Sequence, residues 1–202
     1  RSYKECVSQS LELAKKNNSS TTWTLGNHDQ MRYATKLGLH PIVDRNDWLL
    51  SHGTSHPVDF EIGTRCSVAG NLFILALPGC TYIYQGEELG LPEAWQLEGK
   101  YRQDPTYART NGERIGRDGC RVPLPWEAGV GAANGFNTTG ESWLPQPANY
   151  RVFSRNLQEG VPGSTLELYK RLLKERRAFG MGSGAFRWAE EHQDKNTLAY
   201  VN

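Results

Sequence analysis

The sequence predicts an α/β fold in which helices connect the strands of a parallel sheet. Two short runs of β-branched and aromatic residues, at 21–26 and 80–84, each follow a stretch with apolar residues at helical spacing. Each run is followed by polar residues, at 27–29 and 85–88. The repeated order of helix, strand and polar loop indicates parallel strands with crossover helices. Both strands are expected to be buried.

Three helices are expected. The first has apolar residues at helical spacing along 3–14, and the turn formers at 17–20 end it. The second covers 61–77 and stops at Pro78-Gly79. The last begins at Ser164, because Ser164-Thr165-Leu166-Glu167 has the pattern of a capping box.

The remaining segments are expected to be irregular or short. Residues 37–59 are rich in His, Pro, Asp and Gly, which favours a loop. Residues 89–163 are too long for a simple connection, so we expect a functional loop or an excursion over the surface. Short strands are expected at 185–189 and 197–201. No helical pattern separates them, so the strand–helix alternation has ended there.

Composition limits the possible partners. Among 202 residues, 38% are apolar, and 23 Lys and Arg face 22 Asp and Glu for a net charge of +1. This balance excludes the general positive field that holds nucleic acid or an anionic membrane. No apolar run approaches the roughly 20 residues of a membrane span. We therefore expect no nucleic-acid or membrane partner, and the sequence sets no oligomeric state.

The cysteines and the first residues bear on location. Cys6, Cys66, Cys80 and Cys120 lie far apart, which favours free thiols in a reducing compartment. The run Arg1-Ser2-Tyr3-Lys4-Glu5 has neither an initiator Met nor an apolar signal core, so nothing in it directs export. We expect a cytoplasmic protein, and a chain that has been processed or cut from a longer one.

Asn27-His28-Asp29 is the first candidate site. It follows a strand, where parallel α/β folds place their chemistry, because a rigid strand end aims the side chain. Asn and Asp are also ordinary turn formers, so position alone leaves a plain turn equally possible.

Three motifs in order resemble the α-amylase superfamily of glycoside hydrolases, in its oligosaccharide-cleaving, oligo-1,6-glucosidase-like branch of α-glucosidases. They are TTWTLGNHDQ at 21–30, LPGCTYIYQGEELGLPE at 77–93 and IGRDGCRVPLPW at 115–126. The resemblance implies the C-terminal part of a TIM (β/α)8 barrel, about helix 6 to helix 8, for residues 1–180. It implies the start of an all-β C-terminal domain for 181–202. The fold would then be incomplete.

The resemblance also assigns roles after the first strand. Asp29 would be the third carboxylate of the family, which binds the sugar at the cleaved bond and stabilises its oxocarbenium-like transition state. His28 would hydrogen-bond the same ring. A carboxylate suits the first role because its charge-assisted hydrogen bonds strengthen as positive charge develops.

The segment 117–121 resembles the arginine loop of the family, in which an arginine closes the pocket over the non-reducing end of the substrate. Arg121 is the first choice and Arg117 the second, since a planar guanidinium can pair with an acid and still donate to hydroxyls. A structural ion pair with Asp118 is the alternative. Gly119-Cys120 and Leu124-Pro125 depart from the commoner family pattern, which leaves linkage preference open.

Two further groups have competing interpretations. The resemblance places Glu87 at the pocket rim as a substrate-binding residue, but Glu87 and its neighbour Glu88 also suit the start of a helix. The other group contains His40, His52 and His56 with Asp44, Asp47 and Asp59. Its spacing matches no helix-borne metal pair, so a solvated loop is expected and neither metal nor cofactor is predicted.

Two carboxylates would be missing. Retaining glycosidases need a nucleophile and an acid/base, and the family carries both on earlier strands than those found here. We therefore expect a fragment, inactive alone, of an α-glucosidase that cleaves terminal α-linked glucose from oligosaccharides or disaccharides. The alternatives are a trehalose synthase or sucrose isomerase-like transglycosylase and a non-catalytic glycosidase-like scaffold.

Overall fold

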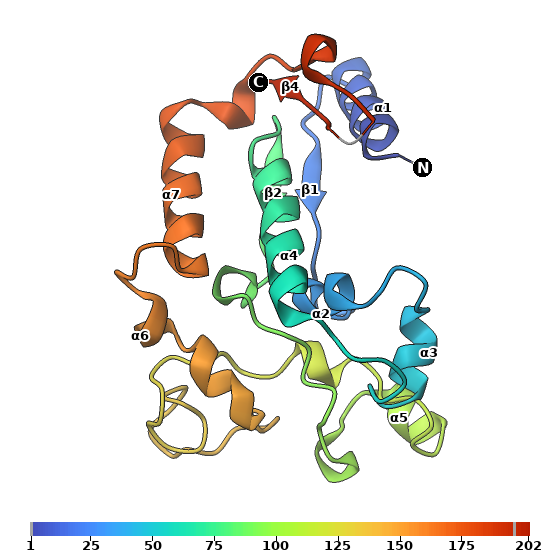
Figure 1. Cartoon of the computed structure of the whole chain (residues 1–202), viewed down its shortest axis with the longest axis vertical. Coiled ribbons are helices and arrows are strands. Elements are labelled where there is room, and N and C mark those ends of the chain that lie inside the picture. Colours follow the sequence, from blue (N-terminus) through green and yellow to red (C-terminus); the bar gives the residue numbers. More distant parts are fainter. Residues whose placement is uncertain (1, 196) are drawn as a thin grey trace.

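The computed structural model describes residues 2–195 and 197–202, and its centre is a parallel pair of strands. β1 (Thr22–Thr24) pairs with β2 (Cys80–Tyr82), and Trp23 lies opposite Thr81. The α-helices are α1 (Tyr3–Lys16), α2 (Tyr33–Gly38), α3 (Arg45–Leu50), α4 (Phe60–Leu75), α5 (Pro105–Arg109), α6 (Arg155–Gln158) and α7 (Thr165–Ala178). The predicted crossover is confirmed, because α4 joins the two parallel strands (Figure 1).

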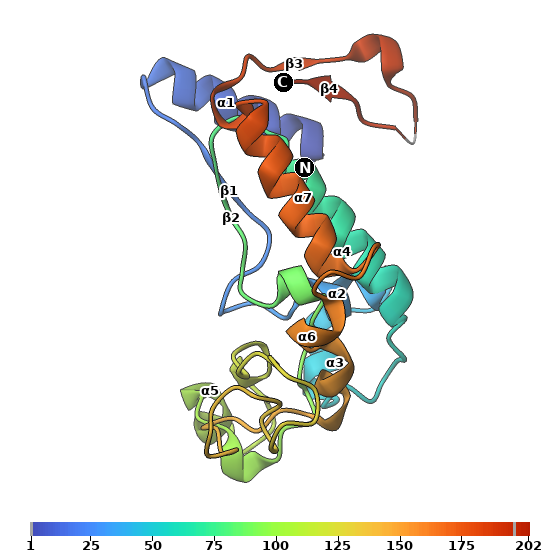
Figure 2. The ribbon, with the colours of Figure 1, turned by 90° about the vertical axis from the view of Figure 1, so that its left-hand side faces the viewer.

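Helices α4 and α7 run side by side along one side of the strand pair (Figure 2). The Asp59 side chain caps α4 by accepting the N–H of Ile62 at 2.9 Å. Gly63 of α4 lies against α2, where an added Cβ would come within 1.9 Å of the Ala34 carbonyl oxygen. Only glycine therefore permits this close helix crossing, which holds α2 just beyond the end of β1.

The prediction that both strands are buried is wrong for the residues described. Along β1 and β2 the outer residues are exposed and only the middle one is half-buried, and Tyr82 is 65% exposed. The reason is that the helices pack on one side of the pair. Val7, Ile74 and Leu77 form the buried cluster on that side, together with Trp23 and Leu25.

The two segments expected to be irregular contain more structure than predicted. α3 lies within 37–59 and is capped by Asp44, and its Trp48 is fully buried. Residues 89–163 form a lobe at the opposite end of the molecule from α1, built on single helical turns, α5 and α6 (Figure 1). This lobe has its own buried cluster, which includes Leu91, Val122 and Tyr150.

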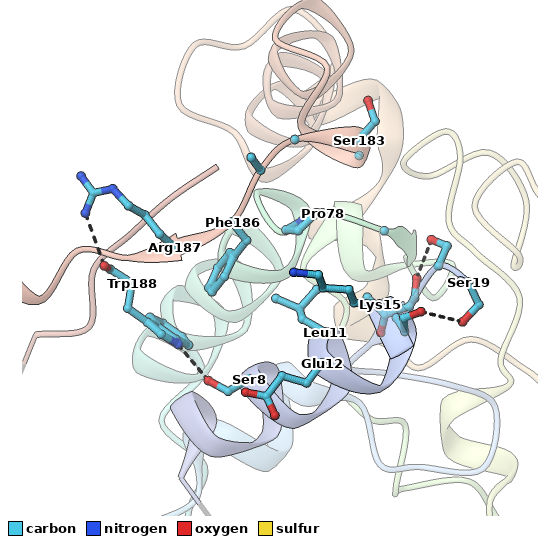
Figure 3. Close-up of a pocket in the computed structure, with 17 residues that line it drawn as sticks. Ser8, Leu11, Glu12, Lys15, Ser19, Pro78, Ser183, Phe186, Arg187 and Trp188 are labelled. Atoms are coloured by element: carbon cyan, nitrogen blue, oxygen red, sulfur yellow. Dashed lines mark hydrogen bonds between the residues drawn. The ribbon is translucent and has the colours of Figure 1, made fainter. Parts of the chain in front are cut away.

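The C-terminal part of the described chain returns to α1. β3 (Arg187–Trp188) and β4 (Tyr200–Val201) lie within the two predicted short strands, and the structure pairs them antiparallel. A groove of about 640 Å³ between α1 and the segment around β3 is lined by Leu11, Pro78 and Phe186, among others (Figure 3). It also contacts Gly79, which precedes β2. The groove therefore lies at the end of the strands away from Asn27-His28-Asp29.

Candidate active site

Asn27, His28 and Asp29 follow β1 in a tight turn. The Asn27 side-chain oxygen accepts the N–H of Asp29 at 2.8 Å, so Asn27 shapes the turn. This bond leaves the Asp29 carboxylate free to face outward, with its side chain 47% exposed. His28 Nε2 lies 3.6 Å from Asp29 Oδ2. The turn is therefore present, and the two residues after Asn27 present polar groups at the end of β1, while their role as a site stays a prediction.

Two arginines meet the Asp29 carboxylate. Arg117 Nη1 donates to Asp29 Oδ1 at 2.7 Å, and Arg121 Nη2 donates to the same oxygen at 2.9 Å. Arg121 Nε also donates to the His28 carbonyl at 2.9 Å. The structure thus brings together four of the five residues that the sequence singled out, although 88 or more positions separate the arginines from Asp29.

The arginines fix the charge of Asp29. Desolvation opposes ionisation, but the charges of His28 and Arg117 and the hydrogen bonds from both arginines outweigh it, so the pKa of Asp29 lies below its ordinary value. At neutral pH the group is a carboxylate flanked by two guanidinium groups. Such a cluster can accept and donate hydrogen bonds to neighbouring hydroxyls at once.

Arg117 also binds a second carboxylate, that of Asp104, which sequence reasoning missed. Its Nε donates to Asp104 Oδ2 at 2.5 Å, and its backbone N–H donates to the same oxygen at 3.0 Å. Asp104 is buried, and these bonds with that from the Thr106 N–H hold its pKa far below the usual range despite desolvation. The alternative of an ion pair between one of these arginines and Asp118 is not observed, because Arg117 pairs with Asp29 and Asp104, and Arg121 pairs with Asp29. Asp118 Oδ2 instead accepts the N–H groups of Gln103 and Asp104, each at 3.0 Å.

Glu87 does not lie at the rim. It is buried, and its Oε2 accepts the N–H of Tyr84 at 3.1 Å, while Glu88 accepts the N–H of Gly86 at 2.7 Å. An added Cβ on Gly26 would lie 2.3 Å from Glu87 Oε1, so this carboxyl packs beneath the turn that carries Asp29. Desolvation raises the pKa of Glu87 to about 7. Its position supports the turn and gives no direct contact with Asp29.

A cavity of about 220 Å³ opens beside Asp29 and Arg117. Asn46 and Leu49 of α3 form one wall, and Arg114 lies on another. The helix missed within 37–59 therefore borders the candidate site. No periodic pattern indicates this helix, because α3 has only 6 residues and a single buried side chain, Trp48.

Some of the His and Asp residues of 37–59 have structural roles. Asp44 and Asp59 are helix caps, and His40 Nδ1 accepts the N–H of Ile42 at 3.4 Å. Across the described residues, no group of three or more His, Cys, Asp or Glu side chains is arranged to hold a metal ion. In the same part of the chain, no helix has both the length and the apolar character needed to cross a bilayer.

Parallel strands joined by a crossover helix, with polar side chains after β1, define the α/β class of protein, and comparison with known proteins identifies the family. Residues 1–181 match the family described as "Alpha amylase, catalytic domain", and the chain belongs to that family. The resemblance seen in the three motifs is therefore confirmed, and the fold is that of part of its (β/α)8 barrel. Which barrel strand or helix each element represents stays a prediction.

The relatives are longer proteins. A salivary alpha-glucosidase of Aedes aegypti is 28% identical over 167 residues, which are 81% of this chain and 24% of that protein. A probable alpha-glucosidase of Rhizobium meliloti is 31% identical over 156 residues, 77% of this chain and 24% of that one. The solved trehalulose synthase MutB from Pseudomonas mesoacidophila is 21% identical with a TM-score of 0.71, covering 98% of this chain and 35% of its own. The chain thus spans about a quarter of the curated relatives. A cytoplasmic location stays a prediction.

Proposed function

We propose that the chain is part of a retaining α-glucosidase that releases terminal α-linked glucose from short oligosaccharides. The observation that carries the proposal is the Asp29 carboxylate held by Arg117 and Arg121 at the end of β1, in a chain of the α-amylase family. The near-zero net charge suits an uncharged sugar.

In this proposal Asp29 stabilises the transition state. Positive charge develops at the anomeric carbon as the glycosidic bond breaks, and a carboxylate that stays ionised gains attraction as that charge grows. The low pKa of Asp29 keeps it in that form at neutral pH. His28 binds the same sugar ring, and Arg121, with Arg117 beside it, closes the pocket over the terminal glucose.

The nucleophile and the acid/base belong to other residues of the whole enzyme. Retaining hydrolysis requires two carboxyl groups about 5 to 5.5 Å apart. In the described residues, the charged partners of Asp29 are His28, Arg117 and Arg121, none of them a carboxylate. We therefore propose that this chain supplies the transition-state stabiliser and the terminal-glucose contacts but does not hydrolyse glucosides alone.

The division of the chain is also a proposal. Residues 1–180 would form the part of the barrel from about helix 6 to helix 8, and residues 181–202 would begin the C-terminal β domain. The family match that ends at residue 181 supports this boundary, as does the change from α7 to the antiparallel β3–β4 pair.

Kinetics of the intact enzyme on p-nitrophenyl α-glucoside and maltose test the function. The unaltered enzyme should release glucose, and Asp29→Asn should lower kcat by about 100-fold with a smaller change in KM, because the lost interaction is made in the transition state. Asp44→Asn is the matched control, since Asn caps a helix as well as Asp does. An unchanged kcat in Asp29→Asn would contradict the role of Asp29. Rearranged disaccharides as the main product would instead favour the isomerising alternative.

A further inference from the structure

Arg32, three positions after Asp29, is buried where three loops meet. Arg32 is only 4% exposed, and its guanidinium lies 5.1 Å from the centre of the Tyr84 ring. Its backbone N–H donates to Oε2 of the buried Glu93 at 2.9 Å. An arginine is seldom buried so completely, because desolvating its charge is costly unless its donors are used.

The donors of Arg32 connect loops that lie far apart in the sequence. Nη1 donates to the carbonyl of Gln85, which follows β2, and Nη2 donates to the carbonyl of Cys120, both at 2.9 Å. The Tyr84 hydroxyl donates to the same Cys120 carbonyl at 2.8 Å. One planar guanidinium therefore ties the loop after β1 to the loop after β2 and to the segment between Arg117 and Arg121.

Cys120 contacts both Arg32 and the candidate site. Its Sγ lies 3.3 Å from the His28 carbonyl, which also accepts Arg121 Nε at 2.9 Å. Arg121 then meets the Asp29 carboxylate. Arg32 is thus separated from the Asp29–Arg121 pair by a single residue, although it does not touch that pair itself.

We propose that Arg32 is a positioning residue that sets the distance between Asp29 and Arg121 by holding the Cys120 carbonyl. The proposal rests on the function proposed above. A lysine cannot replace it fully, because an ammonium lacks the planar fork that reaches two carbonyl groups at once. Loss of the fork lets the 117–121 segment move, and misplacement of a substrate-contacting group by about 1 Å can cost on the order of 100-fold in rate.

The matched control is Arg176, at the other end of the strands. Its Nη1 donates to the Leu77 carbonyl at 2.7 Å, and its Nη2 donates to the Gly79 carbonyl at 2.5 Å. Like Arg32, Arg176 donates hydrogen bonds to backbone carbonyl groups, but these carbonyls belong to the segment that precedes β2. Arg176→Lys should disturb stability as Arg32→Lys does, without reaching the site.

Two readouts in the intact enzyme test the proposal. The first is kcat and KM on p-nitrophenyl α-glucoside, and the second is the alkylation rate of Cys120 by iodoacetamide, measured by peptide mass spectrometry. Cys120 is buried, and desolvation raises the pKa of its thiol to about 12, so it should react slowly in the unaltered enzyme. The exposed Cys6 of α1 and Cys66 of α4 are internal references.

Arg32→Lys should lower kcat by about tenfold and speed Cys120 alkylation by about tenfold relative to the references, while Arg176→Lys should change neither. If Arg32→Met folds, it should change kcat and the alkylation rate of Cys120 more than Arg32→Lys does. If it does not fold, Arg32→Lys, which keeps the positive charge, provides the test. The proposal is overturned if Arg32→Lys leaves both readouts unchanged, or if the two lysine variants behave alike. An unaltered enzyme without glucosidase activity would contradict the proposed function, whereas Cys120 alkylation would still decide whether Arg32 holds the segment.

Discussion

Glu87 should make the stability of the protein depend on pH. Desolvation raises the pKa of its buried carboxyl from 4.5 to about 7. Between these values the folded protein holds a proton that the unfolded chain has released. The contribution of the group is therefore fully present below about pH 4.5 and is lost as the pH rises through 7.

Glu87→Gln should remove this loss, because glutamine is neutral at every pH tested. We expect the variant to gain stability relative to the unaltered protein as the pH rises from 5 to 8, by at most about 3 kcal/mol. Thermal unfolding at the two pH values measures the change. Glu113→Gln is the control, since Glu113 is exposed and is not among the groups that shift the pKa of Glu87. Parallel pH curves for Glu87→Gln and the unaltered protein would rule out a buried, protonated Glu87.

Sequence reasoning found the outward-facing residues of the candidate site and missed those that support them. Asp29 and Arg121 stand in motifs whose residue types fit sugar chemistry. Arg32 and Asp104 act through hydrogen bonds to chain segments that only folding brings near, such as the bond from Arg32 to the Cys120 carbonyl across 88 positions. Glu87 was misplaced for the same reason, because its burial depends on Gly26 packing against it.

One residue, Ser164, caps the N-terminus of α7 and connects this helix to the preceding one. Ser164 Oγ accepts the N–H of Glu167 at 3.2 Å and donates to the Gln158 carbonyl at 2.7 Å. The predicted reciprocal bond of a capping box is not made, because the Glu167 carboxylate accepts the N–H of Gly160 and the ammonium of Lys170 instead. Ser164 therefore caps the helix and also fastens it to α6.

Ser164→Ala should lower the free energy of unfolding by about 1 kcal/mol or slightly more, because both bonds are lost. Ser164→Thr keeps a hydroxyl and should lose much less. Urea unfolding of the three proteins gives the comparison. Equal midpoints for the alanine variant and the unaltered protein would show that this cap does not contribute to stability.

Long elements were predicted well and short ones poorly. The apolar spacing of α1, α4 and α7 extends over several turns, so the pattern is clear in the sequence. α3 is too short for such a pattern, and it forms because Asp44 caps it and Trp48 packs against Trp95 from a distant segment. The two strands were located correctly, but their burial depends on what covers their second face, which no local pattern records.

The whole described chain should lack hydrolytic activity when purified alone. Asp29 has no carboxylate partner there, and Asp104, which shares Arg117 with it, is buried. We expect no release of p-nitrophenol from p-nitrophenyl α-glucoside above the rate in buffer. Release that disappears in Asp29→Ala would contradict this expectation, whereas release that persists in that variant would indicate a contaminating glucosidase.

The three motifs and their order predicted the family, which the match over residues 1–181 confirms, and the family implies the barrel. The lobe at 89–163 could not be predicted in detail, because its cluster around Leu91, Val122 and Tyr150 joins residues from three distant turns. The lobe nevertheless folds back to the ends of the strands, and this brings Arg117 and Arg121 into contact with Asp29.

The separation of Asp29 from its arginines also sets the order in which the site can form during synthesis. Arg121 follows Asp29 by 92 positions, so at about 5 to 20 residues per second the ribosome adds it roughly 5 to 20 s later. During that interval the chain contains the turn after β1 but neither of the arginines that pair with Asp29. The nascent chain can therefore pair Asp29 with Arg117 and Arg121 only after the lobe has been made and has folded back.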